Sequence, residues 1–172
     1  PFRRTGAFMT DYVVIAISSG ALTAVRIALL GLPTDGVVTL SDKMTGHALQ
    51  LLFLSLPVLL YFSVLESGGW QATIGKRVCG LSVTMADGGR IPFVRALLRN
   101  ALRLLPWEMS HAAIWYVPGQ PFVDDVPAFN MTVFIAAILI SLIYLAALFI
   151  GSGRTPYDRL AGVAVQRRGS IT

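Results

Sequence analysis

The sequence has few cysteines and few charged residues. Of its 172 residues one, Cys79, is a cysteine, and 13% are charged. A single cysteine excludes an internal disulfide framework, and because no Cys-x-x-Cys pair or Cys/His cluster accompanies it, there is no zinc or haem signature. We therefore expect Cys79 to be a small packed residue, and we expect no metal and no other cofactor.

The motifs of common hydrolases and nucleotide-binding proteins are also absent. The chain has no Gly-x-Ser-x-Gly turn, no His-Glu-x-x-His pair and no ordered Ser/His/Asp set, so nothing indicates covalent or metal-dependent hydrolysis. Gly75-Lys76 is similar to the end of a phosphate-binding loop, but Arg77 replaces the required Ser or Thr and Trp70 occupies the first glycine position. We do not expect an enzyme.

Apolar residues, in contrast, are abundant. They make up 55% of the chain, and the mean hydropathy is +0.68. Soluble domains of this length do not normally reach such values, so many apolar side chains must face lipid. Because about 100 to 200 residues is the usual size of one folding unit and no hydrophilic block is long enough to fold alone, we expect one membrane domain over residues 1–172.

Long apolar stretches predict the membrane spans, because about 20 apolar residues cross a hydrocarbon core about 30 Å thick. Three stretches are long enough, namely Gly6 to Leu30, His47 to Leu65 and Ala128 to Ile150. A fourth, residues 101–117, is a weaker candidate because polar residues and a proline interrupt it. These are Arg103, Pro106, Glu108 and His111.

Basic residues orient these stretches, because Lys and Arg near the ends of a span stay on the cytoplasmic side. The start of the chain, the loop 66–100 and the tail 151–172 are basic, whereas the segments 31–46 and 118–127 carry no basic excess. Only an even number of crossings puts a basic loop and a basic tail on one side. We therefore expect an all-α bundle of four transmembrane helices in the cell inner membrane, with both ends in the cytoplasm.

An alternative with three crossings remains open, in which residues 93–117 lie along the inner surface. Arg95, Arg99 and Arg103 follow one another at four-residue spacing and would then face lipid headgroups. Both arrangements keep these arginines at the inner surface, so we expect them, with Lys76 and Arg77, to bind anionic phospholipids. The net charge of +5 does not indicate nucleic-acid binding, because the charges lie in loops beside apolar spans.

The cytoplasmic loop is expected to contain a short β-hairpin. Residues 81–85 alternate apolar and polar side chains, and Asp87-Gly88-Gly89 supplies turn chemistry before Arg90 and Ile91. Pro92 is then expected to begin the next helix.

Asp11 is a carboxylate within an apolar span, which costs about 2.5 to 3.5 kcal/mol on insertion scales. Arg4 is the nearest candidate partner, on the same helix face but about 10 Å away along the axis. That distance is too wide for a direct bridge between fixed backbones, so a partner elsewhere is equally open. In the tail, Thr155 to Asp158 has the pattern of a helix start, and Asp158 could also meet Arg4 or the arginines of the loop.

Glu108 and His111 form one Glu-x-x-His pair within the weak span. Di-iron bundles need two such pairs and further carboxylates, so the pair does not indicate a metal site. We expect a polar pair inside the bundle, buried against Asp11 or water, that can hold or relay a proton.

Four motifs follow in order along the chain: Arg4, Asp11 seven residues later, the loop from Thr73 to Val83, and the segment from Tyr157 to Val163. Together they resemble the RDD family, which is named for an arginine at the start of the first membrane helix, an aspartate within it and a second aspartate. The resemblance implies that Arg4, Asp11 and Asp158 form a functional constellation. It also implies a small multipass protein for which transport has been suggested, with cation/proton exchange proposed for some members.

Two functions remain open. In the first, the protein moves a cation or proton, which Asp11 exchanges with help from Glu108 and His111 as the helices rearrange. A four-helix chain is small for alternating access, so a homo-oligomer is then expected. In the second, the protein is an assembly module that transports nothing: Arg4, Asp11 and Asp158 lock the helices together, and the basic surface binds lipid or a partner membrane protein.

Overall fold

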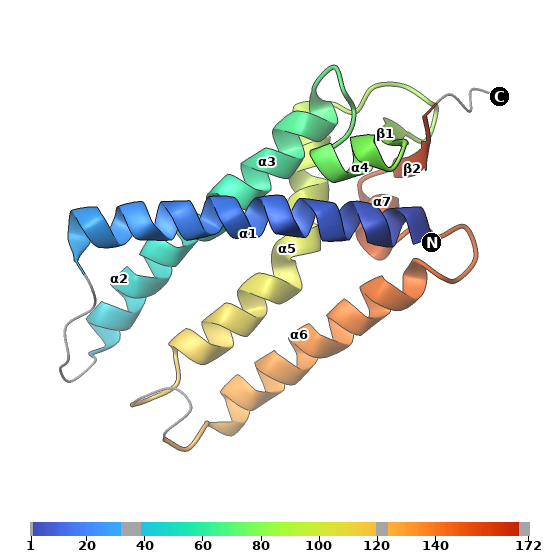
Figure 1. Ribbon diagram of the computed structural model, residues 1–172. Helices are drawn as coiled ribbons and strands as arrows, with labels where there is room; N and C mark the ends of the chain where they lie inside the picture. The colour runs from blue at the N-terminus through green and yellow to red at the C-terminus, as the bar shows by residue number, and fades with distance from the viewer. Residues whose placement is uncertain (1, 32–38, 120–123, 169–172) are drawn as a thin grey trace.

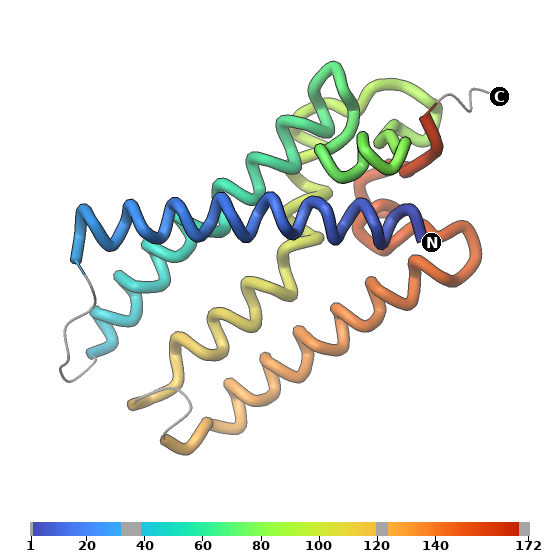
Figure 2. The backbone as a smooth tube through the Cα atoms, in the orientation of Figure 1, coloured from blue at the N-terminus to red at the C-terminus, as the bar shows by residue number. Residues whose placement is uncertain are grey.

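Four long helical segments make up most of the molecule. The computed structural model describes residues 2–31, 39–119 and 124–168. The four segments run back and forth between the same two ends of the molecule (Figure 1). Short helices and both strands gather at one of these ends, where the described chain also starts and finishes (Figure 2). We call this the sheet end, and the opposite one the far end.

The long segments are α1 (Phe2–Leu30), a second one made of α2 (Leu40–Gln50), the π-helical turn η1 (Leu51–Ser55) and α3 (Leu56–Ser67), then α5 (Phe93–Trp115) and α6 (Ala128–Ala147). The short elements are α4 (Ile74–Val78), β1 (Leu81–Met85), α7 (Pro156–Leu160) and β2 (Val163–Arg167).

Three of the long segments are apolar enough to cross a membrane. They are α1, the segment Leu40–Ser67, and α6, with mean hydropathies between 2.1 and 2.2. The three clear apolar stretches of the sequence are thus confirmed as long helices. The second begins at Leu40 rather than at His47, because Thr39 caps the helix and accepts a hydrogen bond from the backbone N–H of Asp42. The fold is that of an all-α membrane protein.

The weak stretch 101–117 is part of the longer helix α5, which is not among the three apolar candidates. Pro92 precedes its first residue, as predicted, and Pro106 lies within it. The helix packs against both α3 and α6 and reaches from the sheet end to the far end (Figure 1). Its first half therefore carries the predicted arginine stripe into the sheet end.

The strand predicted at residues 81–85 is present as β1, but the predicted hairpin is wrong. β1 pairs antiparallel with β2 from the tail, so that Met85 lies opposite Val163. The expected turn does follow β1. Only Arg90, Ile91 and Pro92 then separate the turn from the start of α5, and this segment forms no second strand.

A small hydrophobic core joins this sheet to its neighbouring helices. It consists of Val83, Ile91, Ala96, Ala161 and Val163, each at most 3% exposed. Two come from the strands and one from α5, while Ile91 lies just before α5 and Ala161 just after α7. The loop and the tail thus fold as one unit at the sheet end.

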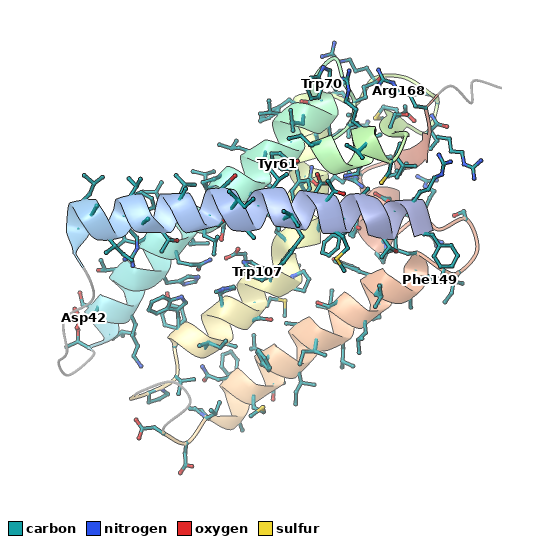
Figure 3. All side chains as sticks on the ribbon, in the orientation of Figure 1. Asp42, Tyr61, Trp70, Trp107, Phe149 and Arg168 are labelled. Atoms are coloured by element: carbon teal, nitrogen blue, oxygen red, sulfur yellow. The ribbon has the colours of Figure 1, made fainter. Side chains whose placement is uncertain are left out.

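Large apolar side chains stand outward from the long helices (Figure 3). Ile17 on α1 is 70% exposed and Leu142 on α6 is 54% exposed. Such surfaces are unfavourable in water and suit contact with lipid chains. Parts of the segments 31–46, 118–127 and 151–172 lie outside the described residues.

Candidate functional site

Asp11 lies where α1 passes over the start of α4, and it is 1% exposed. Its carboxylate accepts three hydrogen bonds: from the Thr73 hydroxyl at 2.6 Å, from the Gly75 backbone N–H at 2.8 Å and from the Tyr61 hydroxyl at 2.8 Å. Tyr61 comes from α3 (Figure 3). The partners of this intramembrane carboxylate are therefore neutral donors on other elements, and the carboxylate ties α1 to α3 and α4.

Gly75 permits this close approach of α1 and α4. A β-carbon at that position would lie 2.9 Å from Cγ of Asp11 and would collide with the backbone oxygen of Ala7. Thr73 caps α4 and accepts a hydrogen bond from the N–H of Lys76 while its own hydroxyl donates to Asp11. Both residues belong to the loop motif quoted above.

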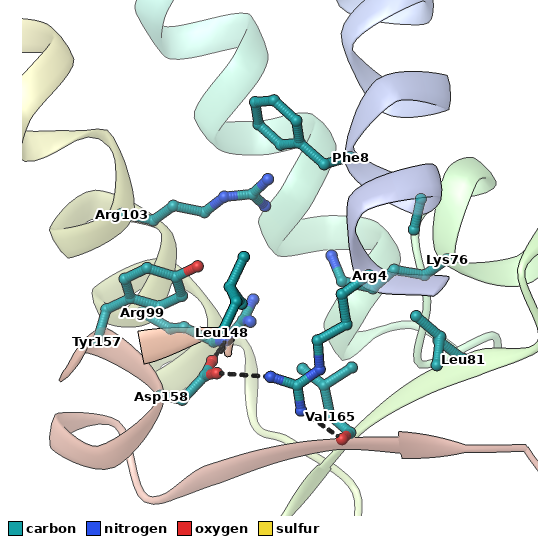
Figure 4. A pocket seen from close by; sticks show the side chains of 11 residues that line it. Arg4, Phe8, Lys76, Leu81, Arg99, Arg103, Leu148, Tyr157, Asp158 and Val165 are labelled. Atoms are coloured by element: carbon teal, nitrogen blue, oxygen red, sulfur yellow. Dashed lines mark hydrogen bonds and ion pairs between the residues drawn. The ribbon is translucent and has the colours of Figure 1, made fainter. Parts of the chain in front are cut away.

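Arg4 and Asp158 meet at the sheet end, although Asp11 is not with them. Nη1 of Arg4 lies 3.9 Å from Oδ2 of Asp158 (Figure 4). The same guanidinium donates to the backbone oxygens of Gly153 and, at 2.7 Å, of Val165. The predicted constellation is thus split: Asp11 holds the loop, whereas Arg4 and Asp158 hold the tail.

A chain of buried ion pairs extends from Asp158 across the sheet end. Arg99 donates to Asp158 at 2.8 Å and to Glu66 at 2.7 Å. Glu66, which is 0% exposed, also accepts from Lys76 at 2.8 Å and from the Asn100 amide at 2.9 Å. Because unpaired buried charges are strongly unfavourable, these mutual contacts hold the ends of α3, α4, α5 and α7 together.

Burial also affects the protonation of this network. It lowers the pKa of Lys76, although the charge of Glu66 opposes that shift. Lys76 and Arg99 are therefore committed to partners within the protein. They do not lie free on the surface, as headgroup binding would require.

The other three arginines expected to bind lipid make different contacts. Arg77 stacks on Trp70 at 4.1 Å from the ring centroid, and both side chains are exposed. Arg95 is exposed and contacts the sulfur of Met85. Arg103 lies 4.0 Å over the ring of Phe62 and is partly buried.

Glu108 lies in the middle of α5 beside a pocket of about 280 Å³. The pocket is lined by Leu51, Ser55, Leu56, Leu59, Ala101, Leu104 and Glu108. Both carboxylate oxygens of Glu108 are buried, and neither has a hydrogen-bond partner among the described residues. The carboxylate of Glu108 therefore differs from those of Asp11 and Glu66, whose oxygens accept hydrogen bonds.

His111 does not pair with Glu108. Its Nδ1 lies 2.9 Å from the backbone oxygen of Trp107, and the ring centroids of the two residues lie 4.4 Å apart with the ring planes tilted by 47°. Ser55, in the π-helical turn η1, also lines the pocket, and its hydroxyl accepts a hydrogen bond from the side-chain amide of Gln50 at 2.8 Å. The side-chain oxygen of Gln50 is buried and has no partner among the described residues. Such wide helical turns occur frequently at functional sites.

Comparison with known proteins was made on the whole chain. A model of the RDD family matches residues 1–162. The chain belongs to the RDD family. A search of curated proteins and a search of solved structures each gave no match. With its three apolar helices, this RDD-family chain is an integral membrane protein.

Sequence reasoning missed two parts of the site in this RDD-family chain. Glu66 was counted only as an acid in a basic loop, although it ends an apolar helix and the cost of burial that drew attention to Asp11 applies to it equally. The donors to Asp11 were missed because they are ordinary polar groups far away in the chain. Among the described residues, no group of three or more His, Cys, Asp or Glu could hold a metal ion.

Proposed function

We propose that this RDD-family protein moves a monovalent cation or a proton across the membrane, and that Glu108 takes up the transported ion. The supporting observation is the pair of buried Glu108 oxygens without hydrogen-bond donors, beside a pocket of about 280 Å³. A buried carboxylate without donors is stabilised by accepting a proton or by binding a cation. Ser55 also lines this pocket and provides a further oxygen for such an ion.

The proposal requires α5 to cross the membrane as the third of four transmembrane helices. Both ends of the chain then lie in the cytoplasm, and the membrane is the cell inner membrane. One contact supports this. Near the start of α2, Lys43 donates to the backbone oxygens of Val117 and, at 2.7 Å, of Gly119, just beyond the end of α5. The start of α2 and the end of α5 therefore lie together, as adjacent spans of alternating direction should.

Asp11 has a different role in this proposal from the one expected from the sequence. Three donors at 2.6 to 2.8 Å occupy the oxygens of its carboxylate and fix its position. It anchors α1, while the exchange of the ion takes place at Glu108. Because the chain is small for alternating access, we expect a homo-oligomer to carry out transport.

The second candidate function is an assembly module that binds lipid or a partner membrane protein and transports nothing. The observation that favours it is the network of Glu66, Arg99 and Asp158, because all three are at most 2% exposed and satisfy one another. Such a network can serve structure alone.

Flux measurements distinguish the two functions. Purified protein is reconstituted into liposomes containing a pH-sensitive dye, and cation-linked proton movement is recorded for wild type, Glu108→Gln and Asp125→Asn. The first variant should fall to the level of protein-free liposomes, whereas Asp125→Asn, the same kind of change at an exposed carboxylate, should retain wild-type flux.

Absence of flux with the wild-type protein, or full flux with Glu108→Gln, would overturn the transport proposal. Asp11→Asn provides a further comparison. If Asp11 is an anchor, this variant should unfold at a lower temperature in detergent, and its remaining folded fraction should still transport. Lost flux in a fully stable Asp11→Asn protein would instead return the carrier role to Asp11.

A further inference from the structure

A second pocket lies at the sheet end and differs in character from the one at Glu108. It has a volume of about 80 Å³ and lies between α1, α5 and α7. Four basic side chains line it, those of Arg4, Lys76, Arg99 and Arg103, and Asp158 is its one acidic lining residue (Figure 4).

The basic charges of this pocket exceed the acidic charges that face them. Lys76 and Arg99 share Glu66, and Arg99 and Arg4 share Asp158. Four cations therefore face two carboxylates, which leaves an excess of two positive charges. Like charges held together away from water are unfavourable, so an anion bound in the pocket would stabilise this arrangement.

Arg103 contributes most to this excess. Its guanidinium lies 4.0 Å from the ring centroid of Phe62 and 5.8 Å from that of Phe8. Within the described part of the chain it makes neither a hydrogen bond nor an ion pair, so its N–H groups are available to a ligand. Stacking on aromatic rings holds the guanidinium plane in place without occupying its donors.

We propose that this pocket binds the phosphate group of an anionic phospholipid, with Arg103 and Arg4 as the principal donors. Arginine forks match phosphate oxygens and bind them in pairs. The pocket lies at the first turns of α1 and just beyond the last residue of α6, two of the apolar candidate spans, which is the level of lipid headgroups.

The apolar side chains that line the pocket favour a phospholipid over free phosphate as its ligand. Phe8, which is 49% exposed, and Leu148 also line it, so acyl chains can continue along apolar surface once the phosphate is bound. The small volume suits one phosphate group and leaves the rest of the lipid outside. The site therefore differs from a diffuse basic surface, and it is independent of transport at Glu108.

Thermal unfolding in mild detergent tests this proposal. Wild-type protein is titrated with phosphatidylglycerol, with phosphatidylcholine and with inorganic phosphate, and the midpoint temperature is followed. We expect phosphatidylglycerol to raise the midpoint saturably and the other two to have little effect. Stabilisation by phosphatidylcholine to the same degree, or by inorganic phosphate alone, would overturn the lipid assignment.

Two variants locate the site. Arg103→Gln should weaken phosphatidylglycerol binding about tenfold, because one charge-assisted contact is lost. Arg95→Gln removes the same charge from an exposed position of the same helix and should bind as wild type does. Equal affinity of Arg103→Gln and wild type would overturn the proposal, and so would an equal loss in Arg95→Gln. Arg103→Lys, which keeps the charge, should fold and retain intermediate affinity if the first variant is too unstable to measure.

Discussion

At the scale of single residues, two buried carboxylates are stabilised by different means. Asp11 accepts hydrogen bonds from two hydroxyls and one backbone N–H, all of them neutral. Glu66 accepts from Lys76, Arg99 and the amide of Asn100. Loss of charge at Asp11 leaves dipoles without a strong acceptor. Loss of charge at Glu66 leaves the buried Lys76 without its ion pair and Arg99 with Asp158 alone, which is the more costly outcome.

Glu66→Gln should therefore destabilise the protein strongly. The variant keeps the size of the side chain but leaves Arg99 and Lys76 without their shared anion, and breaking a buried pair in this way costs about 3 to 5 kcal/mol. The free energy of unfolding in mixed micelles, measured by denaturant titration, checks this value. The exposed Asp125→Asn serves as the matched control and should stay within about 0.5 kcal/mol of wild type. Equal stability of the two variants would contradict a structural role for the network.

How much of the site the sequence could predict depends on the distance between partners. Asp11 and Asp158 could be identified locally, one by its place in an apolar span and the other by its place at a helix start. The contact between Arg4 and Asp158 joins residues far apart in the sequence, so Arg4 could be named only as one possible partner of Asp158, beside the arginines of the loop. Glu108 was predicted to be a relay residue, and its use in transport stays a prediction.

At the scale of elements, the docking of α4 onto α1 depends on the absence of a side chain. Gly75 lies against Ala7 and Asp11 with no space for a β-carbon. The short helix thereby presents its first turn to the carboxylate of a long apolar helix. The loop motif of the family thus contributes to packing through Gly75 as well as to hydrogen bonding with Asp11.

Gly75→Ala should push α4 away from α1 and lengthen the hydrogen bonds to Asp11. Overpacking of this kind costs about 1 to 3 kcal/mol. Gly20→Ala in α1 is the matched control, because nothing lies within 4 Å of a β-carbon there, and it should be neutral or slightly stabilising. Thermal unfolding in detergent compares the two variants. A Gly75→Ala protein as stable as Gly20→Ala would show that α4 is not tightly docked.

The elements themselves differ in how well local sequence predicts them. The apolar helices follow from long runs of residues, and β1 follows from the alternation of residues 81–85. The partner of β1 does not, because Val163 and its neighbours are more than seventy positions away and only the shared core selects them. The turn residues around Gly88 led instead to the prediction of a hairpin, in which β1 would pair with the short segment just after the turn.

At the scale of the whole molecule, the alternating direction of the long helices makes a prediction about the two faces of the membrane. The described parts of the segment 118–127 lie at the far end, and the end of β2 lies at the sheet end (Figure 1). If α5 crosses the membrane, the segment 118–127 faces the outside and the end of β2 faces the cytoplasm. If α5 lies along the surface, the segment 118–127 faces the cytoplasm and the end of β2 faces the outside.

Cysteine labelling tests this topology, and the single native cysteine makes it simple. In a Cys79→Ser background, Asp125→Cys should react with a membrane-impermeant maleimide on intact cells. Arg168→Cys should react only after permeabilisation. Both positions are exposed in the protein, so access does not depend on local packing. The reverse pattern of labelling would require three crossings.

The pairing of β1 with β2 also bears on the order of biosynthesis. The register joins Leu81 to Arg167, so the ribosome must release the chain as far as Arg167 before the sheet can close. Arg4 likewise finds its acceptors Gly153 and Val165 only at that stage. The apolar helices can enter the bilayer as they emerge, whereas the sheet end is completed last and from long-range contacts, which form slowly. A nascent chain that stops short of β2 thus lacks the strand that closes the core, and quality-control proteases have a structural feature by which to recognise it.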